Sequence, residues 1–322
     1  MLKTLKYSSV LVRTVRPQLR WYASPVSSQA VDNPIEDKLK TETKRLSKTA
    51  KKFWDKVSVA EDKDQDKFVV QLDTRPIRTP LGYPLAVDKD RGLLAALLQK
   101  EWSNVPNGTV RPHALPLTSL VSRCIDLEHA NEEGANADLK VKIGGDREEL
   151  SKSLLRYLDT DTLLVFSPRN ELEGKLRMAQ DEMYLPIIAS VEKFLDHFSE
   201  APVSLNILDA DVHGLRGNAQ DPNTILAAKK YLDSLTAWDL AVFEKTVLVT
   251  KSFICGLLLL QSKTLRKPSH GLEYTMEDIA RAATLETIYQ TERWGEVEDT
   301  HDVDKRDIRR NVHAAAIAAY KP

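Results

Sequence analysis

The chain has 322 residues, of which 42% are hydrophobic and 29% charged, with 46 Lys and Arg against 47 Asp and Glu. Its formal net charge of −1 excludes a protein built mainly to neutralise nucleic-acid phosphates, and its apolar content excludes a disordered chain. The length predicts two domains, because a single hydrophobic core rarely grows beyond about 250–300 residues.

The two cysteines, Cys124 and Cys255, are too few to form a disulfide framework or a zinc site by themselves. We therefore interpret them as core residues and expect a reducing compartment. The most apolar uncharged run, residues 252–262, is far shorter than the roughly 20 residues that a membrane-spanning helix needs. No stable membrane insertion is expected.

Residues 1–22 form a basic segment without acidic residues, and the first acid of the chain is Asp32. Apolar residues share one face of a helical wheel, and the other face carries most of its five basic residues, which are Lys3, Lys6, Arg13, Arg16 and Arg20. This pattern is typical of a mitochondrial transit peptide, with a disordered basic tail as the alternative. Cleavage after Tyr22 would leave 41 basic and 47 acidic residues, a net charge of −6.

Residues 23–52 are polar and show little periodicity, so we interpret them as a linker. From Phe53 onward, apolar and polar residues alternate, which predicts two half-buried strands near residues 57–59 and 68–72. The acidic run 61–66 between them is predicted to be the solvated connection of a hairpin.

A third strand is predicted over residues 83–87. Asp88 is then expected to cap a helix that ends near Trp102, and a second helix is expected to begin near Thr118. Strands followed by two helices within about 90 residues are typical of a small α+β domain. Residues 53–145 are predicted to form this domain.

Residues 146–322 are predicted to form a C-terminal α-helical domain, with its main helices over about 148–157, 172–198, 236–261 and 275–294. The third of these becomes apolar on all sides in its second half, as is typical of a helix at the centre of a bundle. The last clear helix opens at Thr275, with Asp278 placed as in a capping box, and ends near Trp294.

The sequence contains no phosphate-binding loop, dinucleotide-binding fingerprint, nucleophile elbow or zinc-protease motif. Asp159 and Asp161 follow a predicted helix, and we interpret them as caps of the turn in preference to paired catalytic carboxylates. No catalytic residue and no cofactor are predicted.

One segment, residues 296–304, gathers several side chains that could bind a divalent metal ion: Glu296, Glu298, Asp299, His301, Asp302 and Asp304. A metal site here would indicate a metal-dependent hydrolase. However, the spacing matches no EF-hand loop, and four basic residues follow within residues 305–310. The same segment therefore also fits a solvated charged surface, and we predict no metal site.

On the helix that ends near Trp294, Glu286, Gln290 and Arg293 share one face. The opposite face can point to the core through Ile279, Ala282, Leu285 and Tyr289. Ordinary helix amphipathicity explains this pattern, so the pattern alone assigns no function.

Several separated segments follow one another in an order that matches a known family. They are Phe53-Trp54, Arg75-Pro76-Ile77-Arg78-Thr79-Pro80, Glu101-Trp102, Leu115-Pro116-Leu117-Thr118-Ser119-Leu120, Tyr157-Leu158-Asp159-Thr160-Asp161-Thr162, Leu285-Glu286, Tyr289-Gln290 and Trp294-Gly295. Together they resemble the family of mitochondrial chaperones that assemble the F1 sector of ATP synthase by binding its alpha subunit. The likeness covers about residues 52–304, apart from residues 131–145.

The resemblance implies a small N-terminal α+β domain followed by a C-terminal orthogonal helical bundle, a mitochondrial matrix location, and binding of the unassembled alpha subunit without ATP hydrolysis. The resemblance also implies that a glutamate of the late helix is important for function. This glutamate corresponds to Glu286, and the nearby Glu292 is the alternative. Gln290 and Arg293 would share that binding face.

Trp102, Asp161 and Trp294 match the family motifs as structural positions, and Trp102 has either a folding or a contact role. We expect a monomer, because a chaperone of this kind must present a free face. A metal-dependent matrix hydrolase is the alternative, and an RNA-associated factor is disfavoured by the acidic mature chain.

Overall fold

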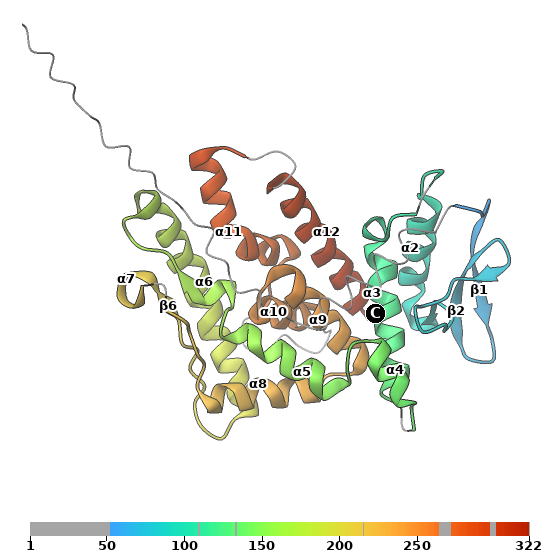
Figure 1. Cartoon of the computed structure of the whole chain (residues 1–322), viewed down its shortest axis with the longest axis horizontal. Coiled ribbons are helices and arrows are strands. Elements are labelled where there is room, and N and C mark those ends of the chain that lie inside the picture. Colours follow the sequence, from blue (N-terminus) through green and yellow to red (C-terminus); the bar gives the residue numbers. More distant parts are fainter. Residues whose placement is uncertain are drawn as a thin grey trace, which may run out of the picture. The chain divides into compact units, whose positions relative to one another are not determined.

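The computed structural model describes residues 52–108, 110–132, 134–214, 216–263, 272–296 and 301–321 (Figure 1). The predicted transit peptide and nearly all of the predicted linker lie outside these residues. Within them, no helix is long and apolar enough to cross a membrane. The described strands are β1 (Val57–Asp62), β2 (Lys67–Leu72), β3 (Arg75–Pro76), β4 (Ala86–Asp88), β5 (Val165–Phe166) and β6 (Leu208–Asp209).

The described helices begin with α2 (Gly92–Ser103), α3 (Pro116–Ala130), α4 (Ala137–Lys142), α5 (Arg147–Leu155), α6 (Lys175–Leu195) and α7 (Ala210–His213). They continue with α8 (Pro222–Ser234), α9 (Ala237–Thr250), α10 (Phe253–Lys263), α11 (Met276–Trp294) and α12 (His301–Ala319). The fold class is therefore α+β, with a small sheet first and helices after it, as predicted.

The sheet is built around β2, which pairs antiparallel with β1, β3 and β4. The β1–β2 hairpin closes between Asp62 and Lys67, so residues 63–66 of the acidic run form its turn, as predicted, whereas Glu61 and Asp62 still belong to β1. Asp62 organises that turn, because its carboxylate accepts hydrogen bonds from the backbone N–H groups of Asp64 and Gln65 at 3.0 and 3.1 Å.

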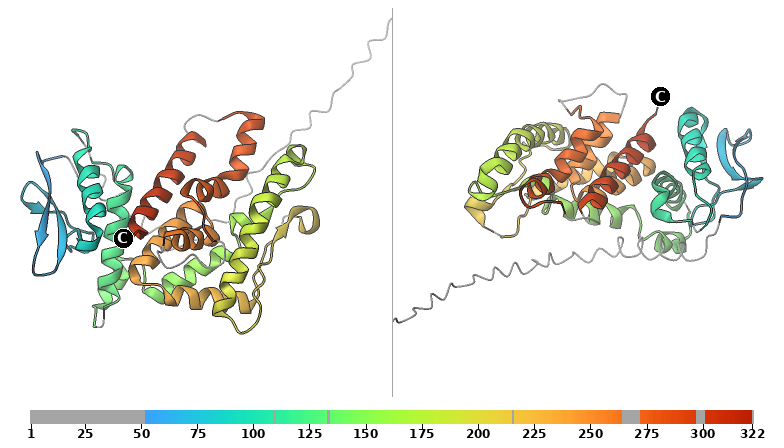
Figure 2. Two further views of the ribbon diagram at one scale, coloured as in Figure 1. Left: turned by 180° about the vertical axis from the view of Figure 1, so that it is seen from behind. Right: turned by 90° about the horizontal axis from the view of Figure 1, so that it is seen from above.

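Helix α2 covers the sheet and contacts β1, β2 and β4 (Figure 2). The prediction that Asp88 caps this helix is wrong. Asp88 makes no capping hydrogen bond, and a single turn of 3-10 helix, Lys89–Arg91, separates it from the start of α2. Its carboxylate instead lies 3.7 Å from the ammonium of Lys67 on the neighbouring strand, which neutralises it at the sheet.

The Glu101-Trp102 pair joins the end of α2 to the start of α3. The Glu101 carboxylate accepts the backbone N–H groups of Leu117 and Thr118 at 2.9 and 2.8 Å, which satisfies free donors of the first turn of α3. The Trp102 indole donates to the Thr118 hydroxyl at 2.8 Å and packs edge-on against Trp54, with ring centroids 5.2 Å apart. This geometry favours the folding role of Trp102.

Helix α3 packs against α9 and α12, and so connects the sheet region to the helices. Arg123 donates to both carboxylate oxygens of Glu244 on α9, at 2.8 and 3.0 Å, and to the Ile143 carbonyl at 2.7 Å. The predicted domain boundary near residue 145 stays a prediction.

A second connection joins residues that are far apart in sequence. The buried Arg91 guanidinium donates to the Ala318 carbonyl at 2.6 Å and lies 4.3 Å from the centroid of the Trp238 ring. The Trp238 indole donates to the same carbonyl at 2.9 Å. Two donors thus satisfy a carbonyl of the last turn of α12.

The apolar stretch predicted as one helix over residues 236–261 is two helices, α9 and α10, and the prediction of a continuous helix is wrong. The chain turns at Lys251, which has a left-handed φ of 58°. The buried Asp161 carboxylate then accepts the backbone N–H of Ile254 at 2.9 Å, and its other oxygen accepts that of Leu163 at 2.9 Å. Asp161 is thus a structural cap, and burial raises its pKa to about 6.

Two further boundaries differ from the sequence predictions. The helix expected from residue 172 begins at Lys175, after a turn with left-handed backbone. Helix α11 is not the last one, because α12 follows from His301 and buries Val312 and Ala315 between its neighbours. The basic residues after the acidic segment are therefore part of a packed helix and not only a charged surface.

Asp126 on α3 offers a test of pH-dependent stability. It is 2% exposed, one of its oxygens accepts the backbone N–H of Leu81 at 3.3 Å, and its other oxygen has no hydrogen-bond partner among the described residues. Burial raises its pKa from 3.8 to about 6. A raised carboxyl pKa gives stability that is complete below the ordinary pKa and is lost as the pH rises through the folded value.

We therefore expect Asp126→Asn to stabilise the protein at pH 8 and to have no stabilising effect at pH 4. The asparagine keeps an acceptor for Leu81 without a buried charge, and the shift of pKa corresponds to about 3 kcal/mol at most. Chemical denaturation of both proteins at the two pH values measures the difference. Asp161 is present in both proteins, so its own titration cancels, and an equal difference at both pH values would contradict the prediction.

Candidate partner-binding site

Helix α11 carries the residues that the sequence assigned to a binding face. Its start is a capping box, in which the Asp278 N–H donates to the Thr275 hydroxyl at 3.1 Å and the Thr275 N–H donates to the Asp278 carboxylate at 3.0 Å. Ile279, Ala282 and Leu285 are buried, as predicted. This burial fixes the rotation of the helix and turns Glu286, Glu292 and Arg293 to the exposed side.

Two contacts place α11 beside the first half of α6. The Tyr184 hydroxyl of α6 donates to the Ala282 carbonyl at 2.8 Å. Near the end of α11, the Arg293 guanidinium lies 3.7 Å from the carboxylate of Glu173, which belongs to the turn Glu171–Gly174 that precedes α6. Increasing residue numbers on α11 therefore run with decreasing numbers on α6, and Glu286 lies between the two contacts.

Glu286 is an exposed acid that has no cationic partner among the described residues. Its carboxylate accepts a hydrogen bond from the Gln290 side chain at 2.7 Å, which confirms that the two share a face. Desolvation by the surrounding chain raises its pKa, and the negative charge of Glu171 raises it further. No Lys, Arg or His of the described chain forms an ion pair with Glu286, whereas Arg293 is paired with Glu173.

The exposed side of α11 combines acids with a large apolar side chain. Trp294 is 71% exposed at the end of the helix, next to the exposed Glu292 and Glu296. On α6, Met178 is also 71% exposed. Exposed Trp residues are enriched at protein interfaces, because their rings bury a large area with little loss of conformational freedom. We call Glu286, Gln290, Glu292, Arg293 and Trp294 the α11 face.

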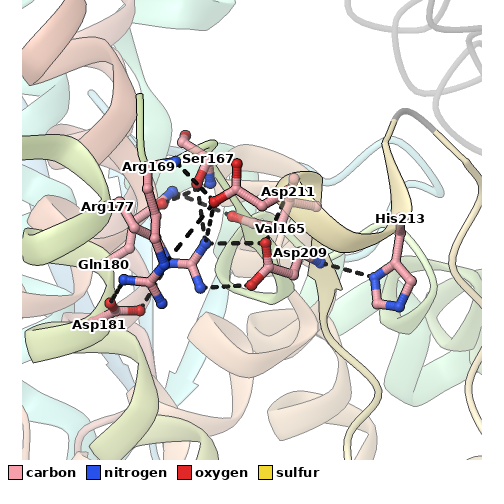
Figure 3. Close-up of polar contacts among 9 residues, drawn as sticks. All are labelled: Val165, Ser167, Arg169, Arg177, Gln180, Asp181, Asp209, Asp211 and His213. Carbon is pink, nitrogen blue, oxygen red and sulfur yellow. Dashed lines mark hydrogen bonds and ion pairs between the residues drawn. The ribbon is translucent and has the colours of Figure 1, made fainter. Parts of the chain in front are cut away.

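Sequence reasoning missed the buried cluster that holds α6 in place, shown in Figure 3. Arg177 of α6 donates to Asp209 at 2.6 Å, to Asp181 at 2.9 Å and to the Ser167 carbonyl at 3.2 Å. Gln180 adds a bond to the Val165 carbonyl at 3.2 Å. The cluster ties α6 to the parallel pair β5–β6. The available signal was a charged residue on the apolar face of a predicted helix.

The acidic segment 296–304, which was weighed above as a metal site, lies only partly within the described residues. Glu298 and Asp299 lie outside the described residues, as do the side chains of His301 and Asp302, while Glu296 and Asp304 are exposed. Over the ranges that the structure describes, no group of three or more His, Cys, Asp and Glu residues could hold a metal ion. Trp102 and Asp161 lie in the supporting fold, as described above, and not on the α11 face.

Comparison with known proteins gives a consistent result. The family model described as "ATP12 chaperone protein" matches residues 51–192. "Protein ATP12, mitochondrial" of Saccharomyces cerevisiae is 55% identical over 324 aligned residues that cover the whole of both chains. The protein atp12 of Schizosaccharomyces pombe, also named as mitochondrial, is 36% identical over 268 residues, 83% of this chain and 81% of its own.

A crystal structure from Agrobacterium tumefaciens, of a protein described as a candidate chaperone, superposes with a TM-score of 0.61. The alignment covers 89% of this chain and 96% of that one at 22% identity, which shows a shared fold. The two fungal matches cover most of the chain at 55% and 36% identity, which shows membership of the same family and not only a shared fold. This chain belongs to the ATP12 chaperone family.

Proposed function

We propose that this protein is an assembly chaperone of mitochondrial ATP synthase, which binds the unassembled alpha subunit of F1 in the matrix until that subunit pairs with beta. Membership of a chaperone family and relatives named as mitochondrial support this proposal. The basic, acid-free residues 1–22 fit import and removal of a transit peptide. We propose a monomer that presents a free face.

The physical task is to cover surface that the client will later bury. A subunit that normally packs against partners exposes apolar patches when it is alone, and such patches aggregate. Covering them needs a complementary surface of roughly 1,200–2,000 Å² and no catalytic group. The exposed Trp294 offers apolar area for this purpose on the α11 face.

The observation that carries the proposal is that no cation in the described part of the chain pairs with the Glu286 carboxylate. A basic side chain of the client would pair with it, relieve its repulsion with Glu171 and so orient the complex. Gln290 holds the carboxylate in position. Glu292 is a second exposed acid of the same helix, whereas Arg293 is engaged by Glu173 in the free protein.

We expect Glu286→Lys to reduce binding of the alpha subunit by at least about tenfold, because it replaces attraction by repulsion at a contact worth about 1.4 kcal/mol or more. Binding of purified alpha and beta subunits to immobilised protein measures this effect. Glu148→Lys makes the same charge change on the exposed surface of α5 and is the matched control. Capture of beta in place of alpha by the wild type contradicts the partner, and undiminished alpha binding by folded Glu286→Lys contradicts the role of Glu286.

A further inference from the structure

The turn Glu171–Gly174, which contacts both α6 and α11, has an unusual backbone. Leu172, Glu173 and Gly174 follow one another with left-handed φ values of 48°, 59° and 76°. Glycine adopts this conformation freely, but a residue with a Cβ atom is strained there, because Cβ approaches the following carbonyl oxygen. Two successive strained residues, one of them a leucine, require other contacts to hold them.

The structure shows which contacts hold the turn. The Leu172 side chain packs against the core, and the Lys175 N–H bonds to the Leu172 carbonyl. The Glu173 carboxylate lies 2.8 Å from the Lys175 ammonium and 3.7 Å from the Arg293 guanidinium of α11. Both ion pairs are solvent-exposed, and exposed pairs stabilise only weakly. The positive φ values therefore make the left-handed form of the turn unfavourable, and the ion pairs of Glu173 help to hold it. A further charged group can disrupt these ion pairs.

The contact with α11 lies on the proposed client-binding face. Arg293 belongs to the α11 face, and Glu171 of the same turn is close enough to Glu286 for their charges to interact. A basic client side chain that pairs with the acids Glu171, Glu173 and Glu286 competes with Arg293 for Glu173 and repels it. Binding at this face therefore removes one of the supports of the strained turn.

We propose that the turn Glu171–Gly174 is a two-state latch: the free protein holds it in the left-handed form through Arg293 and Glu173, and the client binds the relaxed form. This inference rests on the proposed function and adds a way in which client binding is regulated. The affinity for the client then depends on the fraction of molecules in the relaxed form. Return of the turn to the left-handed form would favour release.

Two substitutions at one position separate backbone strain from charge. Glu173→Ala and Glu173→Gly both remove the carboxylate and its pair with Arg293. Alanine keeps the penalty of a Cβ atom at positive φ and so favours the relaxed form, whereas glycine removes the penalty and stabilises the left-handed form. Because both variants lack the same carboxylate, any attraction between Glu173 and the client is lost equally in both, and we expect Glu173→Gly to bind the alpha subunit about fivefold more weakly than Glu173→Ala.

Equilibrium binding of purified alpha subunit to the three full-length proteins tests the latch, and hydrogen exchange of the amides of residues 172–175 gives a second readout. In the wild type, exchange at these amides should change when the alpha subunit binds. Equal affinities for the alanine and glycine variants, with unchanged exchange, would overturn the latch and leave the proposed function intact. A wild type that does not bind the alpha subunit would overturn both. Thermal melting of each variant checks that it is folded.

Discussion

Glu244→Ala is expected to lower the free energy of unfolding by about 3–5 kcal/mol, because it leaves the charge of Arg123 buried without its partner. The guanidinium and the carboxylate form two hydrogen bonds, at 2.8 and 3.0 Å, and their side chains are 12% and 3% exposed. The Ile143 carbonyl would remain as an acceptor for Arg123, but a carbonyl carries no full negative charge. Urea denaturation measures the loss.

Two controls make this result interpretable. Lys229→Ala breaks an exposed pair with Asp233 at 2.8 Å and should change stability very little, because water screens the two charges. The double variant Arg123→Met, Glu244→Leu removes both buried charges and should recover most of the lost stability, since apolar residues often replace a buried ion pair at little cost. A loss in Glu244→Ala no larger than that in Lys229→Ala would show that α3 and α9 are held together by other contacts.

Arg177→Met is expected to destabilise the protein by about 3 kcal/mol at pH 7. Methionine keeps much of the apolar stem but leaves Asp181 and Asp209 without the cation that bonds to both (Figure 3). It also removes the guanidinium that lies 5.2 Å from the centroid of the Phe166 ring. The pair β5–β6 would lose its main polar attachment to α6.

The effect of Arg177→Met should shrink in acid. The hydrogen bond from Arg177 lowers the pKa of Asp209, so this pair stabilises the fold above the ordinary carboxyl pKa and stops doing so as the pH falls through the lowered value. Thermal melting of both proteins at pH 7 and near pH 3 measures the change. Arg169→Met, at the 65%-exposed edge of the same cluster, is the matched control and should have a small effect at both pH values. A pH-independent difference would show that packing and not charge holds the cluster.

Short sequence patterns correctly predicted those helices and strands whose position depends on residues that are close together in the chain. The alternation from Phe53 onward predicted the β1–β2 hairpin, and the Thr275–Asp278 spacing predicted the start of α11. The break between α9 and α10 was missed, although the polar residues Thr250, Lys251 and Ser252 interrupt the apolar run there and the Ser252 hydroxyl accepts the backbone N–H of Cys255 at 3.0 Å. The second cap of α10, the Asp161 carboxylate, lies 93 residues before Ile254. Tertiary contacts of this kind leave no trace in a short window of sequence.

Helix α12 was missed for a different reason. Its buried side is largely alanine, including Ala314, Ala315 and Ala318, and such small residues give a weak apolar periodicity beside a strongly charged first half. On the α11 face, the i, i+4 spacing correctly placed Glu286 beside Gln290. The spacing could not show that Arg293 reaches Glu173, because that contact depends on how α6 and α11 pack.

The bond between Arg91 and the Ala318 carbonyl spans 227 residues of sequence and has a consequence for folding kinetics. Closing so long a loop is slow, and contacts between distant residues lower folding rates. A ribosome makes the chain from its N-terminus, so Arg91 and the apolar surface around it emerge long before their partners on α12. The native fold can therefore be completed only once the whole chain is available, which under the proposed import is after its passage into the matrix.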